Sequence, residues 1–371
     1  MILILVILLY VVSEARDRSS TPKSDARKEA TIEITGNIYF VSPSGDDAAD
    51  GRSERTALLT LQRAVDGLMP GDAAVLADGE YFQDFVTVRD GTAKKPIIIK
   101  GSPSAVVKGS GKPDKIVEIR HSYIALTGFS IDGLGGGDGS KKEHYRDKLV
   151  YVEGLNARQG ITGLRIIGMH LRNAGGECVR LKYFAKKNEV AHNEIKGCGA
   201  YDFLFDGGGK NGEGVYVGTA PEQVKKGNNP TRDVDASDGN WIHDNVIDTQ
   251  GNECVDIKEG SSDNIVERNV CTGQKDADSG GLDGRGNATV FRENEVFGSA
   301  GAGIRVGGDR DSDGIGTLIM SNYLHDNANG GIKVQAWPQG KVCGNRFENN
   351  ANGDIVGKYA SESEDIRSCD D

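Results

Sequence analysis

Apolar and polar residues alternate in short stretches that recur along much of the chain. One set of stretches reads CVRLK, GVYVG, CVDIK, GLDGR, GIRVG and GIKVQ, starting at Cys178, Gly214, Cys254, Gly281, Gly303 and Gly331. A second set surrounds asparagines spaced 52, 24, 25, 28 and 23 residues apart, namely Asn193, Asn245, Asn269, Asn294, Asn322 and Asn345. The step of 52 corresponds to two repeats with an insertion. Repeats of this length, each with two or three alternating strands, predict a β-solenoid.

The repeats indicate an all-β fold, a right-handed parallel β-helix whose coils stack as parallel sheets. A leucine-rich repeat has a similar period, but the leucine consensus and the helical half of that repeat are missing. We expect the recurring asparagines to share one turn and to form a ladder of amide hydrogen bonds between coils. Residues 60–72, TLQRAVDGLMPGD, have apolar positions at helical spacing and predict a helix that caps the N-terminal coil.

Strand alternation also predicts which side chains face outward from the solenoid. One outward column reads Arg180, Tyr216, Asp256, Asp283, Arg305 and Lys333, and its neighbour reads Lys182, Gly218, Lys258, Arg285, Gly307 and Gln335. Neighbouring coils lie about 4.8 Å apart, so Asp256 should stack on Asp283 and Lys258 on Arg285.

Stacked like charges require partners of the opposite sign. Two carboxylates repel unless a cation or a proton lies between them, and two cations favour an anion that spans both. Glu177, Glu213 and Glu253 precede three strands and form a further column of oxygen ligands of the kind that Ca²⁺ prefers, although a structural calcium or a simple turn role is an alternative. We therefore expect calcium at Asp256, Asp283, Glu213 and Glu253, and an acidic ligand at Arg180, Lys182, Arg305 and Lys333.

Two insertions should rise beside this charged face. Residues 218–239 follow one strand of the face, and residues 307–316, GGDRDSDGIG, follow another. The second insertion carries Asp309, Asp311, Asp313 and Gly314, the first half of an EF-hand pattern, but Met320 stands where the required acidic residue belongs. It is a weak calcium signal. His192, His243 and His325 fall on the repeat frames and are interpreted as turn or surface residues.

Composition narrows the function. The 371 residues include 52 Gly and 9 Pro, which favours many tight turns, and the formal net charge of −11 argues against a nucleic-acid partner. Six cysteines fit an oxidising compartment. Their pairing does not follow from spacing, although Cys343 with Cys369 is the expected bridge for the C-terminal tail. Asn287 begins an N-glycosylation sequon.

The opening stretch, residues 1–15, has the short apolar run and small-residue end of a secretory signal peptide, although an uncleaved membrane anchor is an alternative. Residues 16–35 are interpreted as a polar linker. A single β-helix domain is then expected over 36–371, with a cap at 38–85, coils over about 86–358 and a tail at 359–371. We expect a secreted monomer with no membrane span once the signal is removed.

Residues 38–85, which begin IYFVSPSGDD, together with GTAKKPIIIKG at 91–101, resemble the N-terminal cap of secreted β-helix polysaccharide lyases of the pectate-lyase-like and alginate- or chondroitin-lyase-like families. The resemblance covers about residues 38–360. The resemblance implies that the protein acts on extracellular carbohydrates. It also implies a lysine and an arginine on adjacent coils that act on the sugar, and acidic residues that hold calcium. Lys258 and Arg285 are similar to that pair by position and spacing.

A lyase must abstract a proton next to a uronate carboxylate. A lysine that is partly desolvated beside another cation has a lowered pKa, so Lys258 beside Arg285 is a candidate base, and Tyr216 is a candidate proton donor to the leaving oxygen. The alternatives are a glycoside hydrolase with Asp256 and Asp283 as an acid and base pair, a uronate epimerase, and a non-catalytic glycan-binding or wall-associated solenoid. In the last case Lys258 and Arg285 belong to a solvated, charge-laced face.

Overall fold

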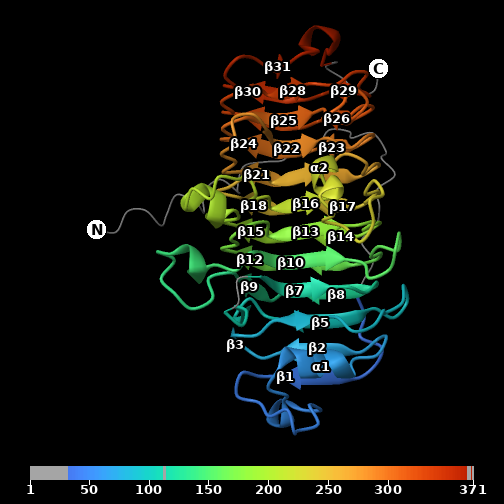
Figure 1. Ribbon diagram of the computed structural model, residues 1–371, viewed down its shortest axis with the longest axis vertical. Coiled ribbons are helices and arrows are strands. Elements are labelled where there is room, and N and C mark those ends of the chain that lie inside the picture. Colours follow the sequence, from blue (N-terminus) through green and yellow to red (C-terminus); the bar gives the residue numbers. More distant parts are fainter. Residues whose placement is uncertain (1–31, 112–113, 366–368, 370–371) are drawn as a thin grey trace.

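The computed structural model describes residues 32–111, 114–365 and 369, and these form a right-handed parallel β-helix (Figure 1). Every strand pair between neighbouring coils is parallel, and each full coil contributes one strand to each of three sheets. The predicted fold class is therefore confirmed. The proposed signal peptide and most of the proposed linker lie outside the described residues.

The strands of the three sheets follow one another in chain order along the solenoid. Sheet 1 contains β1 (Ile38–Val41), β2 (Ala73–Leu76), β5 (Ile97–Gly101), β8 (Ile124–Thr127), β11 (Arg165–Ile167), β14 (Glu189–Ala191), β17 (Trp241–His243), β20 (Ile265–Glu267), β23 (Val290–Arg292), β26 (Leu318–Met320) and β29 (Val342–Cys343). Sheet 2 contains β4 (Phe85–Val86), β7 (Lys115–Ile119), β10 (Lys148–Glu153), β13 (Val179–Lys182), β16 (Val215–Val217), β19 (Val255–Ile257), β22 (Gly280–Gly284), β25 (Ala302–Val306), β28 (Ile332–Val334) and β31 (Ile355–Val356). Sheet 3 contains β3 (Gly79–Tyr81), β6 (Ala105–Val107), β9 (Ser130–Asp132), β12 (His170–Arg172), β15 (Glu194–Lys196), β18 (Val246–Asp248), β21 (Val270–Thr272), β24 (Glu295–Phe297), β27 (Tyr323–His325) and β30 (Arg346–Glu348).

Alternate residues of these short strands fill one apolar core along the axis. The predicted inward columns of sheet 2 are buried, as shown by Val179, Val215, Val255, Leu282, Ile304 and Ile332, each with no exposed surface. Burying large aliphatic side chains is the main force that stabilises such a stack, at about 1.5–3 kcal/mol for each.

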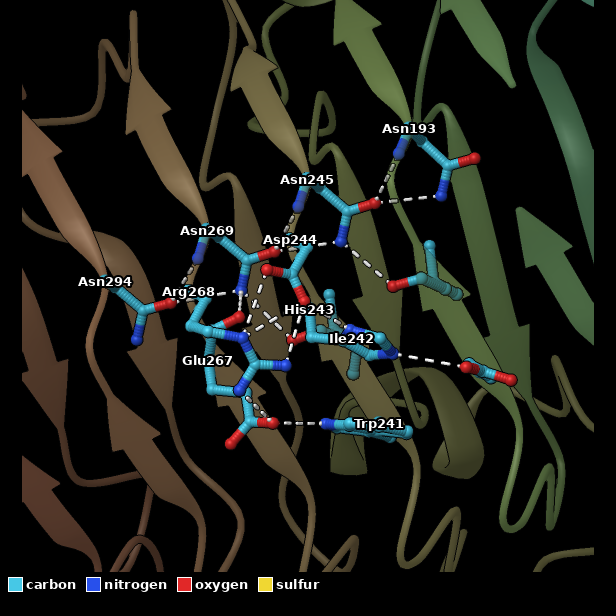
Figure 2. Close-up of polar contacts among 12 residues, drawn as sticks. Asn193, Trp241, Ile242, His243, Asp244, Asn245, Glu267, Arg268, Asn269 and Asn294 are labelled. Carbon is cyan, nitrogen blue, oxygen red and sulfur yellow. Dashed lines mark hydrogen bonds and ion pairs between the residues drawn. The ribbon is translucent and has the colours of Figure 1, made fainter. Parts of the chain in front are cut away.

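The asparagine ladder is present as predicted. Each side-chain amide donates to the side-chain oxygen of the next asparagine, at 2.8 Å from Asn193 to Asn245 and 3.0 Å from Asn269 to Asn294 (Figure 2). The same oxygen also accepts the backbone N–H of the preceding coil's asparagine. The ladder ends where Asn345 donates to Asp365 at 2.8 Å. Because water does not reach these buried amides, their mutual hydrogen bonds supply the partners that the buried polar groups need.

The predicted N-terminal helix is present but short. Helix α1 spans Leu61–Gly67 rather than all of 60–72, begins where Thr60 caps the N–H of Arg63 at 3.2 Å, and buries Leu61, Ala64 and Val65. It contacts β1, β2 and β4 at the N-terminal end of the solenoid (Figure 1). The proline and glycine at 70 and 71 prevent the helix from continuing.

Three disulfides join neighbouring segments of the coils. They are Cys178–Cys198, Cys254–Cys271 and Cys343–Cys369. The expected bridge from Cys343 to the tail is confirmed, and three bridges fit a protein of an oxidising compartment. No helix within the described ranges is long and apolar enough to cross a membrane.

Candidate active site

The outer face of sheet 2 carries the charged column that the sequence predicted. Its strands pair in the expected register, which brings the residues of the first outward column side by side on consecutive coils: Arg180 with Tyr216, Tyr216 with Asp256, Asp256 with Asp283, Asp283 with Arg305, and Arg305 with Lys333. Asp256 and Asp283 face outward but are almost fully buried, and the side chains of Lys258 and Arg305 pair with them on this face.

Two adjoining cavities lie on this face. One, of about 310 Å³, is lined by Glu213, Tyr216, Glu253, Lys258, Arg285 and Arg305. The other, of about 440 Å³, is lined by Tyr151, Glu177, Arg180 and Lys182. Asn211 and Gln223 line both cavities, so the two adjoin. These two residues come from the loop at 197–214 and from helix α2 (Pro221–Lys225) in the insertion at 218–239.

Three carboxylates crowd together beside the smaller cavity, which Glu213 and Glu253 line. Oxygen atoms of Glu213, Glu253 and Asp256 lie within 4.8 Å of one another, and all three side chains are buried. Burial, together with the charges of Glu177 and Asp256, raises the pKa of Glu213 to about 8. Burial and the charges of Asp256 and Glu213 raise the pKa of Glu253 well above its ordinary value. Glu213 therefore holds a proton at neutral pH unless a cation replaces it.

Glu177 was predicted to extend this column, but its surroundings differ. Burial acts to raise its pKa, yet the cations Lys148 and Arg180 outweigh that effect and lower the pKa of Glu177 to about 2. Lys148 lies 2.9 Å from one carboxylate oxygen and Arg180 lies 3.2 Å from the other. Glu177 is thus already compensated, and the structure places it apart from the three-carboxylate cluster.

Asp283 is likewise held by protein partners. Its two oxygens accept bonds from Arg305 Nη1 at 3.0 and 3.1 Å, and Ser279 Oγ lies 3.1 Å away. The structure brings Asp283 beside Asp256 as expected, but its oxygens do not join the converging set. Ser279 also donates to Glu253, a contact that the sequence gave no signal for.

Lys258 lies directly after β19 and forms an ion pair with Asp256, with 2.7 Å between Nζ and Oδ2. Burial acts to lower the pKa of Lys258, but Asp256, Tyr216 and Glu253 together outweigh burial and raise the pKa well above its ordinary value. The expectation of a lowered pKa for Lys258 is therefore wrong. The neighbouring cation Arg285 acts in the expected direction but is weaker than Asp256.

Tyr216 lies between two cations. The guanidinium of Arg180 is 3.4 Å from the centre of its ring, and Nζ of Lys258 is 4.9 Å from the same centre. Its hydroxyl is buried and has no hydrogen-bond partner among the residues that the structure describes. Burial raises the pKa of Tyr216 to about 12, although both cations act to lower it. Burying a hydroxyl without a hydrogen-bond partner lowers the stability of the folded protein. The hydroxyl of Tyr216 is therefore a candidate to bond an atom of a substrate.

Arg285 bonds to carboxylates on either side rather than to Lys258. Its Nε donates to Glu259 at 2.6 Å, and its Nη2 donates to Asp309 in the insertion at 307–316. Lys258 and Arg285 nevertheless keep 15% and 20% of their side-chain surface exposed, and both line the smaller cavity. They are not sealed beneath the loops.

The half EF-hand in that insertion does not form a calcium loop. Asp309 pairs with Arg285, Asp311 lies 3.2 Å from Lys358, and Asp313 lies 3.1 Å from Arg310. Because each carboxylate points to a different cation, the oxygens do not converge. The weak calcium signal was wrong.

Three of the four predicted ligand contacts line the cavities, Arg180 and Lys182 the larger one and Arg305 the smaller one. Lys182 lies 3.0 Å from Glu153 and donates to the backbone oxygen of Asn228 at 2.6 Å. Burial lowers the pKa of Lys182. Arg305 lines the smaller cavity, whereas Lys333 donates to the backbone oxygen of Asp278 at 3.1 Å and lines neither cavity.

The converging carboxylates fit a hard divalent cation. Glu253 Oε2 and Asp256 Oδ1 are buried without a hydrogen-bond partner in the described part of the chain, and both belong to the residues that converge. Carboxylate oxygens are the ligands that Ca²⁺ prefers, and a bound cation would relieve the repulsion that raises their pKa values. Glu213, Glu253 and Asp256 are thus the residues that could hold calcium.

Comparison with solved structures gives strong matches to polysaccharide lyases. An alginate lyase from Paenibacillus sp. strain FPU-7 is 21% identical, with 80% of this chain and 94% of that chain covered at a TM-score of 0.63. The pectate lyase Pel9A is 13% identical, with 87% and 79% covered at a TM-score of 0.58. A mannuronic acid-specific polysaccharide family 6 lyase from the human gut microbiota is 16% identical, with 88% and 84% covered at a TM-score of 0.52.

No family model and no curated protein sequence matches the chain. At these identities the structural likeness carries the fold, and it agrees with the three parallel sheets described above. The protein therefore has the right-handed parallel β-helix fold that these alginate and pectate lyases share.

Proposed function

We propose that the protein is a polysaccharide lyase that cleaves a uronic-acid-containing polysaccharide by β-elimination. The observation that carries this proposal is that Lys258, Tyr216, Glu213 and Glu253 line one cavity, while the buried Asp256 converges with the two glutamates. The structural neighbours that act on alginate and pectate support the same substrate class.

Elimination begins with loss of the proton on the carbon next to the uronate carboxylate. That proton becomes acidic when positive charge is placed against the carboxylate. Arg285 is suited to this role because it lines the cavity and one of its two carboxylate partners, Asp309, is half exposed and lies on a loop. A substrate carboxylate can replace Asp309 while Glu259 continues to hold the other edge of the guanidinium.

Lys258 is proposed as the base and Tyr216 as the proton donor to the leaving oxygen. The pKa of Lys258 is raised, and Asp256 contributes most among the groups that raise it, so the charge of Asp256 must be neutralised before the Lys258 amine can accept the substrate proton. Tyr216, with a pKa of about 12, carries its proton at neutral pH and has no competing hydrogen-bond partner among the described residues. General acid and base catalysis of this kind contributes about 10²–10⁴-fold to a rate.

We infer that calcium is the cofactor, held by Glu213, Glu253 and Asp256. When bound, it supplies positive charge that neutralises carboxylates at the site. Asp256 is both a member of this set and the partner of Lys258, so the state of the cluster and the protonation of the lysine are linked.

The larger cavity is proposed to bind neighbouring sugars of the same chain. Tyr151 offers a ring surface, and Arg180 and Lys182 offer positive charge. The two cavities together span the strands from β10 to β25, a distance of about 24 Å at the usual strand spacing. That length favours an acidic polysaccharide over a single sugar. The expectation of a secreted monomer stays a prediction.

The test is an assay on purified protein with alginate, pectate and glycosaminoglycan substrates, with calcium added or chelated. The unsaturated uronate product absorbs ultraviolet light, so a lyase gives rising absorbance on one polymer and a loss of the rise on chelation. New reducing ends without absorbance would show a hydrolase instead. Binding to a polymer without any cleavage would show a non-catalytic glycan-binding solenoid.

A further inference from the structure

A second group of metal-ligating side chains lies away from the cavity, at the turn from sheet 1 to sheet 3. His192 follows β14. One coil later His243 ends β17 and Asp244 follows it, as Figure 2 shows. One nitrogen of each imidazole and one oxygen of Asp244 all lie within 4.8 Å of one another. The donors are of two kinds, two imidazoles and one carboxylate.

The backbone that carries these donors is rigid. His192 and Asp244 occupy the same left-handed turn position on consecutive coils, with φ of 55° and 53°. Each directly precedes a ladder asparagine, and Asn193 and Asn245 are joined by bonds of 2.8 and 3.0 Å. A site on such a turn is preorganised, because the ladder fixes the spacing of the two coils before any ion arrives.

His243 is oriented in the manner of a metal ligand. It was interpreted as a turn or surface residue, which is wrong, because its ring is fully buried and stacks on Trp241 with 3.6 Å between ring centres. Its Nε2 lies 3.3 Å from Glu189 Oε1, and its Nδ1 lies 2.7 Å from Asp244 Oδ2. Metal-binding histidines usually direct their second nitrogen to a carboxylate in this way. Glu189 is then the carboxylate that orients the ring through Nε2, and Nδ1, which faces Asp244, is the nitrogen that would bind a metal ion.

One cation competes for the site. Arg268 Nη2 lies 2.8 Å from Asp244 Oδ2, and its Nη1 lies 2.7 Å from Glu267 (Figure 2). Because 37% of the Arg268 side chain is exposed and Glu267 would remain its partner, Asp244 can be released without stranding a buried charge.

We propose that His192, His243 and Asp244 bind a divalent transition-metal ion of the zinc type. Imidazole nitrogen with one carboxylate suits Zn²⁺, Co²⁺, Ni²⁺ or Cu²⁺, whereas Ca²⁺ and Mg²⁺ prefer oxygen alone. Three protein ligands with His192 on the surface leave a position for water. The site therefore differs in metal class from the all-oxygen cluster of Glu213, Glu253 and Asp256.

The chain provides a matched control in His325. Its Nδ1 lies 2.7 Å from Asp326, its Nε2 lies 3.3 Å from Glu295, and its ring stacks on Tyr323. These contacts repeat those of His243. Within the described residues, His325 belongs to no group of three metal-ligating side chains, because no second imidazole lies beside it as His192 lies beside His243.

Titration of the full chain with ZnCl₂ in a calorimeter tests the proposal. We expect one Zn²⁺ per chain, at least tenfold weaker binding in His192→Ala, and unchanged binding in His325→Ala and in Glu253→Gln. Excess CaCl₂ should not displace the ion. Co²⁺ should give visible ligand-field absorption in the wild type that His192→Ala loses.

Three results would overturn the proposal. They are no Zn²⁺ binding by the wild type, equal losses in His192→Ala and His325→Ala, and loss in Glu253→Gln alone. His192 is exposed, so its replacement should leave folding intact, and thermal unfolding without metal checks this. The outcome is independent of lyase activity.

Discussion

The ammonium group of Lys258 lies 2.7 Å from Oδ2 of Asp256, which itself belongs to the three-carboxylate cluster. A single side chain thus connects the candidate base with the candidate cation site. Asp256 contributes most among the groups that raise the pKa of Lys258, and a cation held by the cluster would weaken that contribution. Because of this coupling, the rate of the proposed reaction should depend on the cation, which Lys258 alone would not require.

Replacing Lys258 by alanine should lower kcat by about 10²–10⁴-fold on the polymer that the wild type cleaves, because general base catalysis is lost. Product absorbance at saturating substrate measures the effect. Lys196→Ala is the control, since Lys196 is an exposed lysine on sheet 3. A fully active Lys258→Ala enzyme would remove Lys258 from the mechanism.

Tyr216→Phe should lower activity without lowering stability. The ring between Arg180 and Lys258 remains, but a buried hydroxyl with no partner in the described structure is deleted. We expect kcat to fall while the free energy of unfolding stays the same or rises by up to about 1 kcal/mol. Denaturant unfolding beside the lyase assay checks both. A loss of stability would mean that the hydroxyl has a structural bond.

The protein without calcium should lose stability as the pH rises. The pKa of Glu213 is raised from 4.5 to about 8, so the folded state binds this proton more tightly than the unfolded chain does. Stability is then fully present below pH 4.5 and is lost between 4.5 and about 8, by up to about 1.4 kcal/mol per pH unit for one group.

Thermal unfolding in EDTA across that range measures the effect. Added calcium should reduce the slope, because the cation replaces the proton, and Glu213→Gln in EDTA should flatten it. A slope that neither calcium nor Glu213→Gln alters would assign the pH dependence to other groups.

The disulfide Cys254–Cys271 should matter for both stability and cation binding. Cys254 directly follows Glu253, so the bridge fixes the turn that carries this carboxylate. Replacing both cysteines by serine should cost about 2–4 kcal/mol, because the bridge closes a loop in the unfolded chain. Calorimetry should also show weaker calcium binding.

The bridge Cys343–Cys369 is the control for this experiment, since it closes a loop of similar length at the C-terminal end. Its removal should lower stability without weakening calcium binding. Equal loss of calcium affinity in both double variants would show a general effect of unfolding.

The sequence determined the fold and the order of residues along each face. The strand period of two and the asparagine spacing fixed the register of Asp256 on Asp283, because a slip of one residue would turn Val255 and Ile257 of β19 toward solvent. The same register predicted that Lys258 and Tyr216 share the face with the glutamate column. These positions can be predicted from the sequence because each coil of the solenoid repeats the same strand pattern.

Only the tertiary structure decided which charges are compensated. Glu177 and Glu213 occupy equivalent places in the repeat, yet Lys148 and Arg180 neutralise the first and crowding raises the pKa of the second. The partners Glu259 and Asp309 of Arg285, and the pairing of His192 with a buried His243 and Asp244, depend on side-chain packing and on insertions that follow no period. Burial and the distances between charges determine the pKa values of these side chains and the geometry of the metal ligands. The spacing of the repeat predicts neither quantity.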